Sequence, residues 1–234
     1  MSKKETQKKE VLKQDFSKPR VAENLRHNFD VLKSEASELC EKQKKLQIKI
    51  MGNDWIKFFC DEKYDLPAIA FLSEIGELIE SLPFKWWTEQ EFDRENALME
   101  LVDMFHFWLI DLIVSESEDK LYFLNNPPES IYHIKRTIWK EILSLTDKAL
   151  RPKTRETISG FLVHMSAIID LLGYKAEDFI NLYHAKNNLN SERQDKGYKD
   201  DKTKKLIDGE EDNKVLLEEV LKKMKEVKSD EEDN

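Results

Sequence analysis

One stretch of fourteen residues, LVDMFHFWLIDLIV at 101–114, limits most strongly how this chain can fold. At helical spacing its side chains are apolar on nearly every face, and such a helix is stable only when other elements surround it. Glu100 lies directly before this stretch and Asp103 lies inside it. The sequence therefore predicts a helical core against which carboxylates are placed.

The rest of the chain also favours helices. Only six glycines and six prolines occur in 234 residues, whereas turn-rich sandwiches and barrels need many such breakers. We expect an all-α fold, a multi-helix bundle, whose limits follow capping and breaking signals. The expected helices cover about 29–60 with a break near Gly52, 65–83 with Pro67 in the first turn, 88–114 with a capping box of Thr88 and Glu91, a helix after Pro127 and Pro128 that ends near 146, 152–173 ended by Gly173, 176–192, and a docked last helix around 215–224.

The distribution of charged and apolar residues predicts one folded domain with an unstructured segment at each end. The first twenty residues carry seven basic and three acidic side chains and few large apolar ones. We therefore expect residues 1–28 to be a flexible charged extension. Residues 29–228 are expected to form a single all-α domain, and residues 229–234 a disordered acidic tail.

The overall charge excludes several kinds of partner. A net charge of −9 lacks the basic surface that non-specific binding to nucleic acid or to an anionic membrane requires. Cys40 and Cys60 lie far apart and form no C-x-x-C pair, so neither a disulfide framework nor a zinc site is indicated. With no signal-peptide pattern and no apolar run of membrane-spanning length, we expect a cytoplasmic protein.

Two pairs of acidic residues form the candidate metal site. Glu74 and Glu77 lie 60° apart at and beyond the edge of an apolar stripe on the helix 65–83, and an isolated pair of this kind is typical of a solvated face. Glu100 and Asp103 are different, because a carboxylate against an apolar core costs several kcal/mol unless it is paired, protonated or bound to a cation. The two pairs together predict an oxygen cage for hard divalent cations, magnesium first. The stripe consists of Ala68, Phe71, Leu72, Ile75, Ile79 and Leu82.

Other interpretations of the buried polar residues stay open. His106 is more typical of a core histidine, or of one that supports a ligand, than of a ligand itself. Asp111 can pair with a lysine. A ferritin-type di-iron site needs two Glu-x-x-His helices, and we find no second one.

A second group of polar residues suits phosphate. Lys186, Asn190 and Arg193 share one face of a helix at i, i+4 and i+7, a pattern that is usually a solvated face when it stands alone. Facing a carboxylate cage, it becomes the other half of a metal-bridged triphosphate site. The segment FKWW at 84–87 is either a lid on the core or a stacking wall for a base, and Lys85 within it can reach a phosphate.

Taken together, these segments resemble the dimeric all-α dUTPases of the all-α nucleotide pyrophosphatase superfamily. The resemblance covers roughly residues 39–221. It is carried by SEIGELIES followed by FKWW, by ELVDMFHF, and by AKNNLNSERQDKGYK continuing into KKLIDGEEDNKVL.

The resemblance implies magnesium-dependent hydrolysis of dUTP to dUMP and pyrophosphate by a homodimer. It assigns the magnesium ligands to Glu74, Glu77, Glu100 and Asp103, and Glu74 would also help to activate the attacking water. By the same resemblance, phosphate and nucleotide contacts fall to Lys186, Asn190, Arg193, Tyr198, Lys205 and Lys85. Base contacts fall to Gln43, Gln47 and Trp87, where Gln47 stands in place of the family's usual Asn.

Two alternatives remain at this point. One is the same fold and metal chemistry acting on another nucleotide such as dCTP, or on several. The other is a non-catalytic helical module that binds a partner through its acidic face.

Overall fold

The computed structural model describes residues 22–61, 65–124, 126–133, 136–197, 206–207 and 210–232. The expected all-α fold is confirmed, since almost all regular structure among these residues is helical. The single exception is a two-stranded antiparallel hairpin that pairs Leu206 with Glu211 and Ile207 with Glu210. The elements are α2 (Ala22–Met51), α3 (Trp55–Asp61), α4 (Leu66–Glu80), α5 (Arg94–Val114), two short 3₁₀ helices (Glu118–Phe123 and Glu129–His133), α6 (Ile138–Ala149), α7 (Arg155–Leu172), α8 (Ala176–Asp195), β1 (Leu206–Ile207), β2 (Glu210–Glu211) and α9 (Asp212–Glu232).

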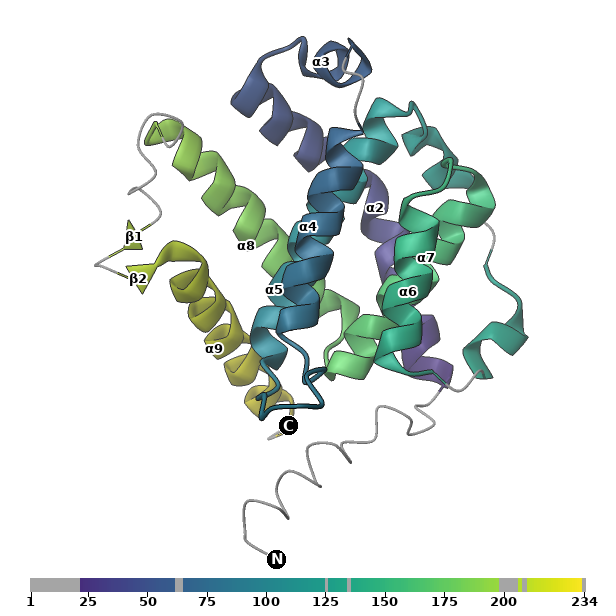
Figure 1. Ribbon diagram of the computed structural model, residues 1–234, viewed down its shortest axis with the longest axis vertical. Coiled ribbons are helices and arrows are strands. Elements are labelled where there is room, and N and C mark those ends of the chain that lie inside the picture. The colour runs from purple at the N-terminus through teal and green to yellow at the C-terminus, as the bar shows by residue number, and fades with distance from the viewer. Residues whose placement is uncertain are drawn as a thin grey trace, which may run out of the picture.

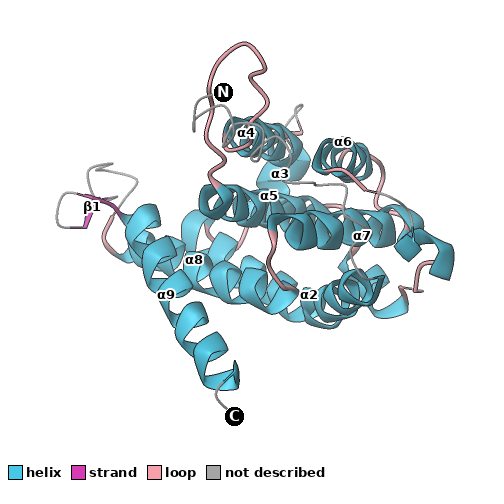
Figure 2. Cartoon of the chain, turned by 90° about the horizontal axis from the view of Figure 1, so that it is seen from below, coloured by secondary structure: helices cyan, strands magenta, loops and turns pink. Residues whose placement is uncertain are grey.

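The main helices stack in three layers. Helices α4 and α6 form one outer layer, α5 and α7 lie in the middle, and α2 and α8 form the other outer layer (Figures 1 and 2). Helix α9 packs beside α8. Because α5 has neighbours on both sides, its apolar residues are buried almost all round, as the sequence predicts.

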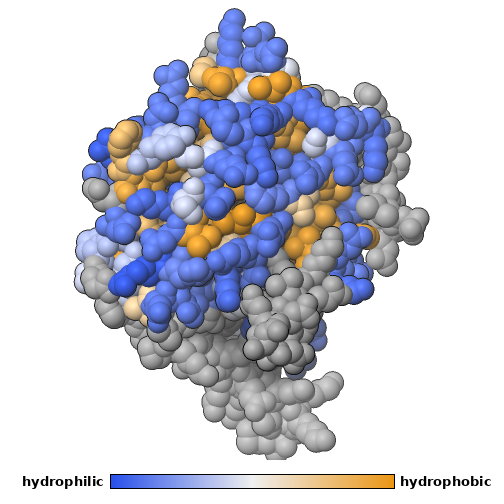
Figure 3. Space-filling view, turned by 180° about the vertical axis from the view of Figure 1, so that it is seen from behind, coloured by the Kyte–Doolittle hydropathy of each residue, from blue (hydrophilic) through white to orange (hydrophobic). Residues whose placement is uncertain are grey.

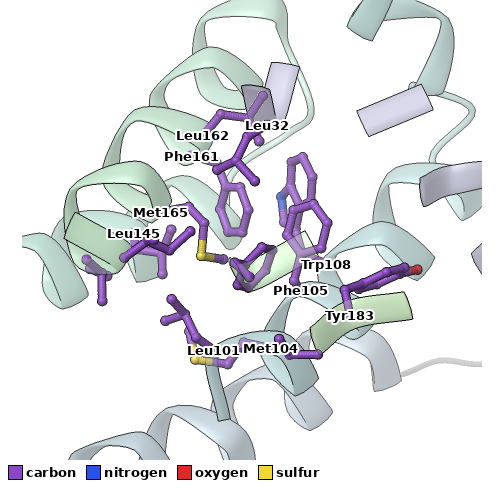
Figure 4. Packing of buried hydrophobic residues seen from close by; sticks show 14 of the residues in the cluster. Leu32, Leu101, Met104, Phe105, Trp108, Leu145, Phe161, Leu162, Met165 and Tyr183 are labelled. Carbon is purple, nitrogen blue, oxygen red and sulfur yellow. The ribbon is translucent and has the colours of Figure 1, made fainter. Parts of the chain in front are cut away.

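Aromatic side chains fill the centre of the bundle. The rings of Trp108 on α5 and Phe161 on α7 stack with their centroids 3.9 Å apart, and Phe105 lies against both of them (Figure 4). Tyr183 on α8 meets the ring of Phe105 edge to face. These contacts join α5, α7 and α8 into a rigid support for the polar residues nearby.

Several predicted helix limits are confirmed. Gly52 separates α2 from α3 with a φ of 88°, and Gly173 ends α7 with a φ of 87°, a left-handed conformation that glycine adopts without strain. The side chain of Asp65 caps α4, and Pro67 lies in its first turn. Asp111 forms an ion pair with buried Lys153, which confirms the pairing of that aspartate with a lysine.

The predicted start of α5 at Thr88 is wrong. The helix begins at Arg94, and the side chain of Asp93 accepts the capping hydrogen bond from the Asn96 backbone. The residues before it form a loop because Gln90 accepts hydrogen bonds from the backbone N–H groups of Phe84 and Lys85. Gln90 also donates to the Glu80 carbonyl, so one amide side chain binds the loop back onto α4.

Two helices extend beyond the limits that the sequence predicts for them. Helix α2 begins at Ala22 rather than Phe29, because Leu25 is buried and the side chain of Asn28 accepts a hydrogen bond from the backbone N–H of Ala176. Helix α9 continues to Glu232, into the segment 229–234 that is expected to be a tail. The division into extension, domain and tail stays a prediction, and residues 1–21 lie outside the described part of the chain.

The surface seen in Figure 3 is mainly hydrophilic, with narrow apolar strips between polar side chains. Among the described residues, no single helix has the length and hydropathy needed to cross a membrane. Only α7 and α8 taken together pass that test, and they meet at a bend of 100°.

Candidate active site

Three glutamates from two packed helices meet at one point. Glu74 and Glu77 come from α4 and Glu100 comes from α5, and one carboxylate oxygen from each lies within 4.8 Å of the others. Glu100 is buried, Glu74 is half-buried and Glu77 is exposed. The i, i+3 spacing on α4 turns both of its glutamates toward α5, as the sequence predicts.

The fourth predicted carboxylate lies beside this group and has a cation as its neighbour. Asp103 follows Glu100 by three residues on α5 and accepts a hydrogen bond from Lys186 Nζ of α8 at 2.7 Å. The Lys186 side chain is only 3% exposed, so this ion pair is shielded from water. Acidic and basic halves of the predicted site are therefore in direct contact.

Burial and mutual repulsion change the acidity of the glutamates. Burial, then the charges of Asp103, Glu77 and Glu100, raise the pKa of Glu74 to about 8. Burial, then the charges of Asp103 and Glu77, raise the pKa of Glu100 to about 7. A hard divalent cation relieves both causes, because it supplies positive charge to oxygen ligands that are already close together. The donor set thus fits such an ion.

A neighbouring amide holds Glu100 in place. Asn96, one turn earlier on α5, donates through Nδ2 to Glu100 Oε1 at 3.0 Å and to the Ser81 hydroxyl at 2.8 Å. Ser81 donates in turn to the Glu77 backbone carbonyl at the end of α4. This chain of hydrogen bonds fixes the carboxylate of Glu100 relative to α4.

The predicted phosphate face on α8 is present and is covered by α9. Arg193 Nη1 donates to Asn190 Oδ1 at 2.9 Å, and its Nε and Nη2 donate to the carboxylate of Asp212. Asn213 Oδ1 accepts hydrogen bonds from Arg193 Nη2 at 2.8 Å and from Lys186 Nζ at 3.1 Å. Lys186 and Arg193 are thereby joined through the first turn of α9.

The loop between α4 and α5 is held by contacts with the end of α4. The Lys85 ammonium group pairs with Glu80, and it also lies 5.3 Å from the centre of the Phe84 ring. Trp86 and Trp87 are 88% and 62% exposed, and their rings meet edge to face. This loop is therefore an exposed aromatic surface at the end of α4 and is not a lid packed on the core.

The glutamines predicted to bind a base are buried on α2. Gln43 Oε1 accepts hydrogen bonds from His106 Nδ1 at 2.6 Å and from the Tyr183 hydroxyl at 3.0 Å. Gln47 is 6% exposed one turn later on the same helix. Burial lowers the pKa of His106 to about 3, so its ring is neutral. The contacts of His106 are those of a core histidine that supports a neighbouring side chain.

Comparison with known proteins agrees with this arrangement. A family model described as dUTPase matches residues 35–198, most of the chain, and that range includes all four carboxylates and the α8 face. The chain belongs to the all-α dUTPase family. As a member of this family it is a dUTP diphosphatase that hydrolyses dUTP to dUMP. The family implies a nucleotide substrate and a divalent metal cofactor, and the glutamate cluster provides ligands for one. No curated protein matched the chain.

The structure describes most, though not all, of the residues predicted to form the site. Tyr198 and Lys205 lie outside the described residues. Asn96, Asp212 and Asn213 contact the predicted site residues, and the sequence did not predict any of the three. Asp212 and Asn213 belong to the GEEDN segment on which the resemblance partly rests, so a signal was present. Asn96 had none, because an asparagine one turn before a glutamate is common on helices.

Proposed function

We propose that dUTP hydrolysis by this chain requires Mg²⁺ held by Glu74, Glu77, Glu100 and Asp103, and that the second product is pyrophosphate. The observation that supports this most is the convergence of three glutamate side chains within 4.8 Å, with one of them buried. Such a group of anions is unfavourable without a cation. Oxygen donors from carboxylates are the ligands that magnesium prefers.

Glu74 is the residue that we propose as the base. When bound, the metal would lower the pKa of a coordinated water and offset the charge of the triphosphate. The Glu74 carboxylate is half-buried and its pKa is raised to about 8. A bound cation would keep this carboxylate ionised, which is the state in which it can accept a proton from a coordinated water.

Cationic and amide groups on α8 are proposed to bind the phosphates. Lys186 touches Asp103, so its ammonium group lies where the acidic and basic halves of the site meet. We assign the further phosphate and nucleotide contacts to Asn190, Arg193, Tyr198, Lys205 and Lys85. Arg193 adds positive charge beside Lys186, with which it shares the Asn213 side chain, and this charge would attract phosphate oxygens.

Base selection is proposed to involve Gln43, Gln47 and Trp87. The two glutamines are one turn apart on α2 and both are buried. Because water does not reach them, their amide groups favour hydrogen bonds with other polar groups such as the edge of a base. The exposed Trp87 offers a ring on which a base can stack. A cytoplasmic location, expected from the sequence, completes this proposal.

We further propose that two copies associate through the outer face of α4 and α6. Leu72 belongs to the stripe that the sequence assigns to the core, yet it is 43% exposed. Ile69 on α4 and Trp139 and Leu143 on α6 are exposed as well, and the two helices form one outer layer (Figure 2). Exposed apolar side chains of this size on one outer layer favour a protein interface.

Pyrophosphate release from dUTP, dCTP, dTTP and UTP tests the proposed specificity. We expect dUTP to be hydrolysed at least tenfold faster than the other three at equal concentration in the presence of magnesium. Comparable rates on several nucleotides would leave the metal site intact and refute base selection by Gln43 and Gln47. No pyrophosphate from any of them would refute the proposed chemistry.

A further inference from the structure

The first residue of α9 forms a buried ion pair that none of the roles above explains. Asp212 is 2% exposed, and its Oδ2 accepts a hydrogen bond from Arg193 Nε at 2.8 Å. Its Oδ1 accepts a second from Arg193 Nη2. Two parallel hydrogen bonds to one carboxylate fix both the place and the plane of a guanidinium group.

Hydrogen bonds to two asparagines also fix the Arg193 guanidinium in place. Nη1 donates to Asn190 Oδ1 on the same helix, and Nη2 also donates to Asn213 Oδ1. Asn213 accepts from Lys186 as well, and Lys186 in turn donates to Asp103. The first turn of α9 is therefore linked by hydrogen bonds through both cations of α8 to the carboxylate group.

The ion pair is not the only contact that holds α9 on the bundle. Leu217 and Leu221 are buried in the main hydrophobic core and hold the helix against the bundle through apolar contacts. A buried charge pair is an inefficient anchor by comparison, because desolvation offsets much of its attraction. Its placement beside the phosphate face instead favours a role in orientation.

We propose that Asp212 is a positioning residue, whose carboxylate fixes the Arg193 guanidinium in the direction that the substrate's phosphates require. The inference rests on the phosphate contact proposed for Arg193. It also brings the first residue of the C-terminal helix, which lies outside the family match at residues 35–198, into the site.

The first test compares Asp212→Asn with Glu219→Gln, which removes a charge from an exposed position on the same helix. We expect Asp212→Asn to raise the KM for dUTP about tenfold or more with a smaller change in kcat, as loss of binding predicts. Glu219→Gln should match the wild type in both constants. An unchanged KM in Asp212→Asn would overturn the proposal.

A double-mutant cycle tests whether Asp212 acts through Arg193. Lysine cannot make the bidentate contact, so Arg193→Lys alone should also raise the KM. In the Arg193→Lys background, Asp212→Asn should change the KM less than twofold. Independent effects of the two changes would overturn the proposal and leave the role of Arg193 intact. No effect of Arg193→Lys would refute both.

Partial loss of α9 packing is the structural alternative, and Leu221→Ala measures it. This variant weakens the apolar contacts of α9 and leaves Asp212 and Arg193 unchanged. We expect Asp212→Asn to raise the KM at least fivefold more than Leu221→Ala does, even where Leu221→Ala lowers the Tm by the same amount or more. Equal rises in KM at equal loss of Tm would make Asp212 only a helix anchor.

Discussion

Glu100, on the buried helix α5, combines burial, a hydrogen bond from a neighbouring amide and nearby negative charges. It is buried, it receives a hydrogen bond from Asn96, and the carboxylates of Asp103 and Glu77 help to raise its pKa to about 7. A residue in that setting stays costly to the fold until a proton or a cation neutralises it. The same electrostatic cost would favour its binding to a divalent cation.

The raised pKa values predict how stability depends on pH. Glu74 and Glu100 hold protons more tightly in the folded state, with pKa values of about 8 and about 7 against an ordinary 4.5. The unfolded chain releases these protons at lower pH, so the metal-free protein should lose stability as pH rises from about 4.5 to about 8. Thermal unfolding in EDTA across this range measures the loss.

Magnesium should oppose that loss because it competes with protons for the same oxygens. We expect the rise in Tm caused by magnesium to be larger at pH 8 than at pH 6. A variant with both Glu74→Gln and Glu100→Gln should show neither the loss nor the rise. An equal magnesium effect at both pH values in the wild type would contradict the assignment.

The sequence predicts best the positions of residues whose spacing puts them on one face of a helix. Two acidic pairs on two apolar helices could meet in few ways, and Glu74, Glu77 and Glu100 do meet. The contact of Asp212 with Arg193 joins residues far apart in the chain, and no local pattern encodes their distance. Exposure of Leu72 was missed for a related reason, since the stripe on α4 does not reveal which layer covers it.

At the scale of elements, helix starts depend on a competition between local signals. Thr88 with Glu91 is a plausible capping box, yet Asp93 is the residue that caps α5. The amide of Gln90 decides the outcome, because it holds the preceding loop against α4. Ends marked by glycine were easier to predict, since Gly52 and Gly173 adopt backbone angles that few other residues tolerate.

Replacement of the competing caps tests this interpretation. Asp93→Ala removes the acceptor of the Asn96 N–H and should lower the free energy of unfolding by about 1 kcal/mol. Thr88→Ala changes an exposed loop residue and should have almost no effect. Chemical denaturation of the two variants beside the wild type gives the comparison. A larger loss in Thr88→Ala would mean that the helix starts earlier.

In the whole molecule, the layer of α4 and α6 carries part of the proposed metal site and also the proposed dimer interface. One side of α4 carries Glu74 and Glu77 toward α5, and its outer side presents Ile69 and Leu72. Two of the four proposed metal ligands and the proposed interface therefore share one helix. Association of two copies would then stabilise the helix that carries Glu74 and Glu77.

An aspartate on the outer face of α4 tests this interface. Leu72→Asp should convert the dimer into a monomer, because a charge at the centre of an apolar contact is poorly tolerated. Phe58→Asp is the matched control, since Phe58 on α3 has an almost equal exposure of 44%. Size-exclusion chromatography with light scattering distinguishes the two states. A dimer in both variants, or a monomeric wild type, would contradict the proposed interface.

The magnesium dependence of dUTP hydrolysis in the wild type and in Glu100→Gln tests whether the glutamate cluster is the metal site. We expect pyrophosphate release by the wild type to be absent in EDTA and to rise to a plateau with added magnesium. Glu100→Gln should require more magnesium and reach a plateau at least about 100-fold lower, because it lacks a buried ligand. Equal magnesium dependence and equal plateaus in the two proteins would contradict the assignment of this cluster as the metal site.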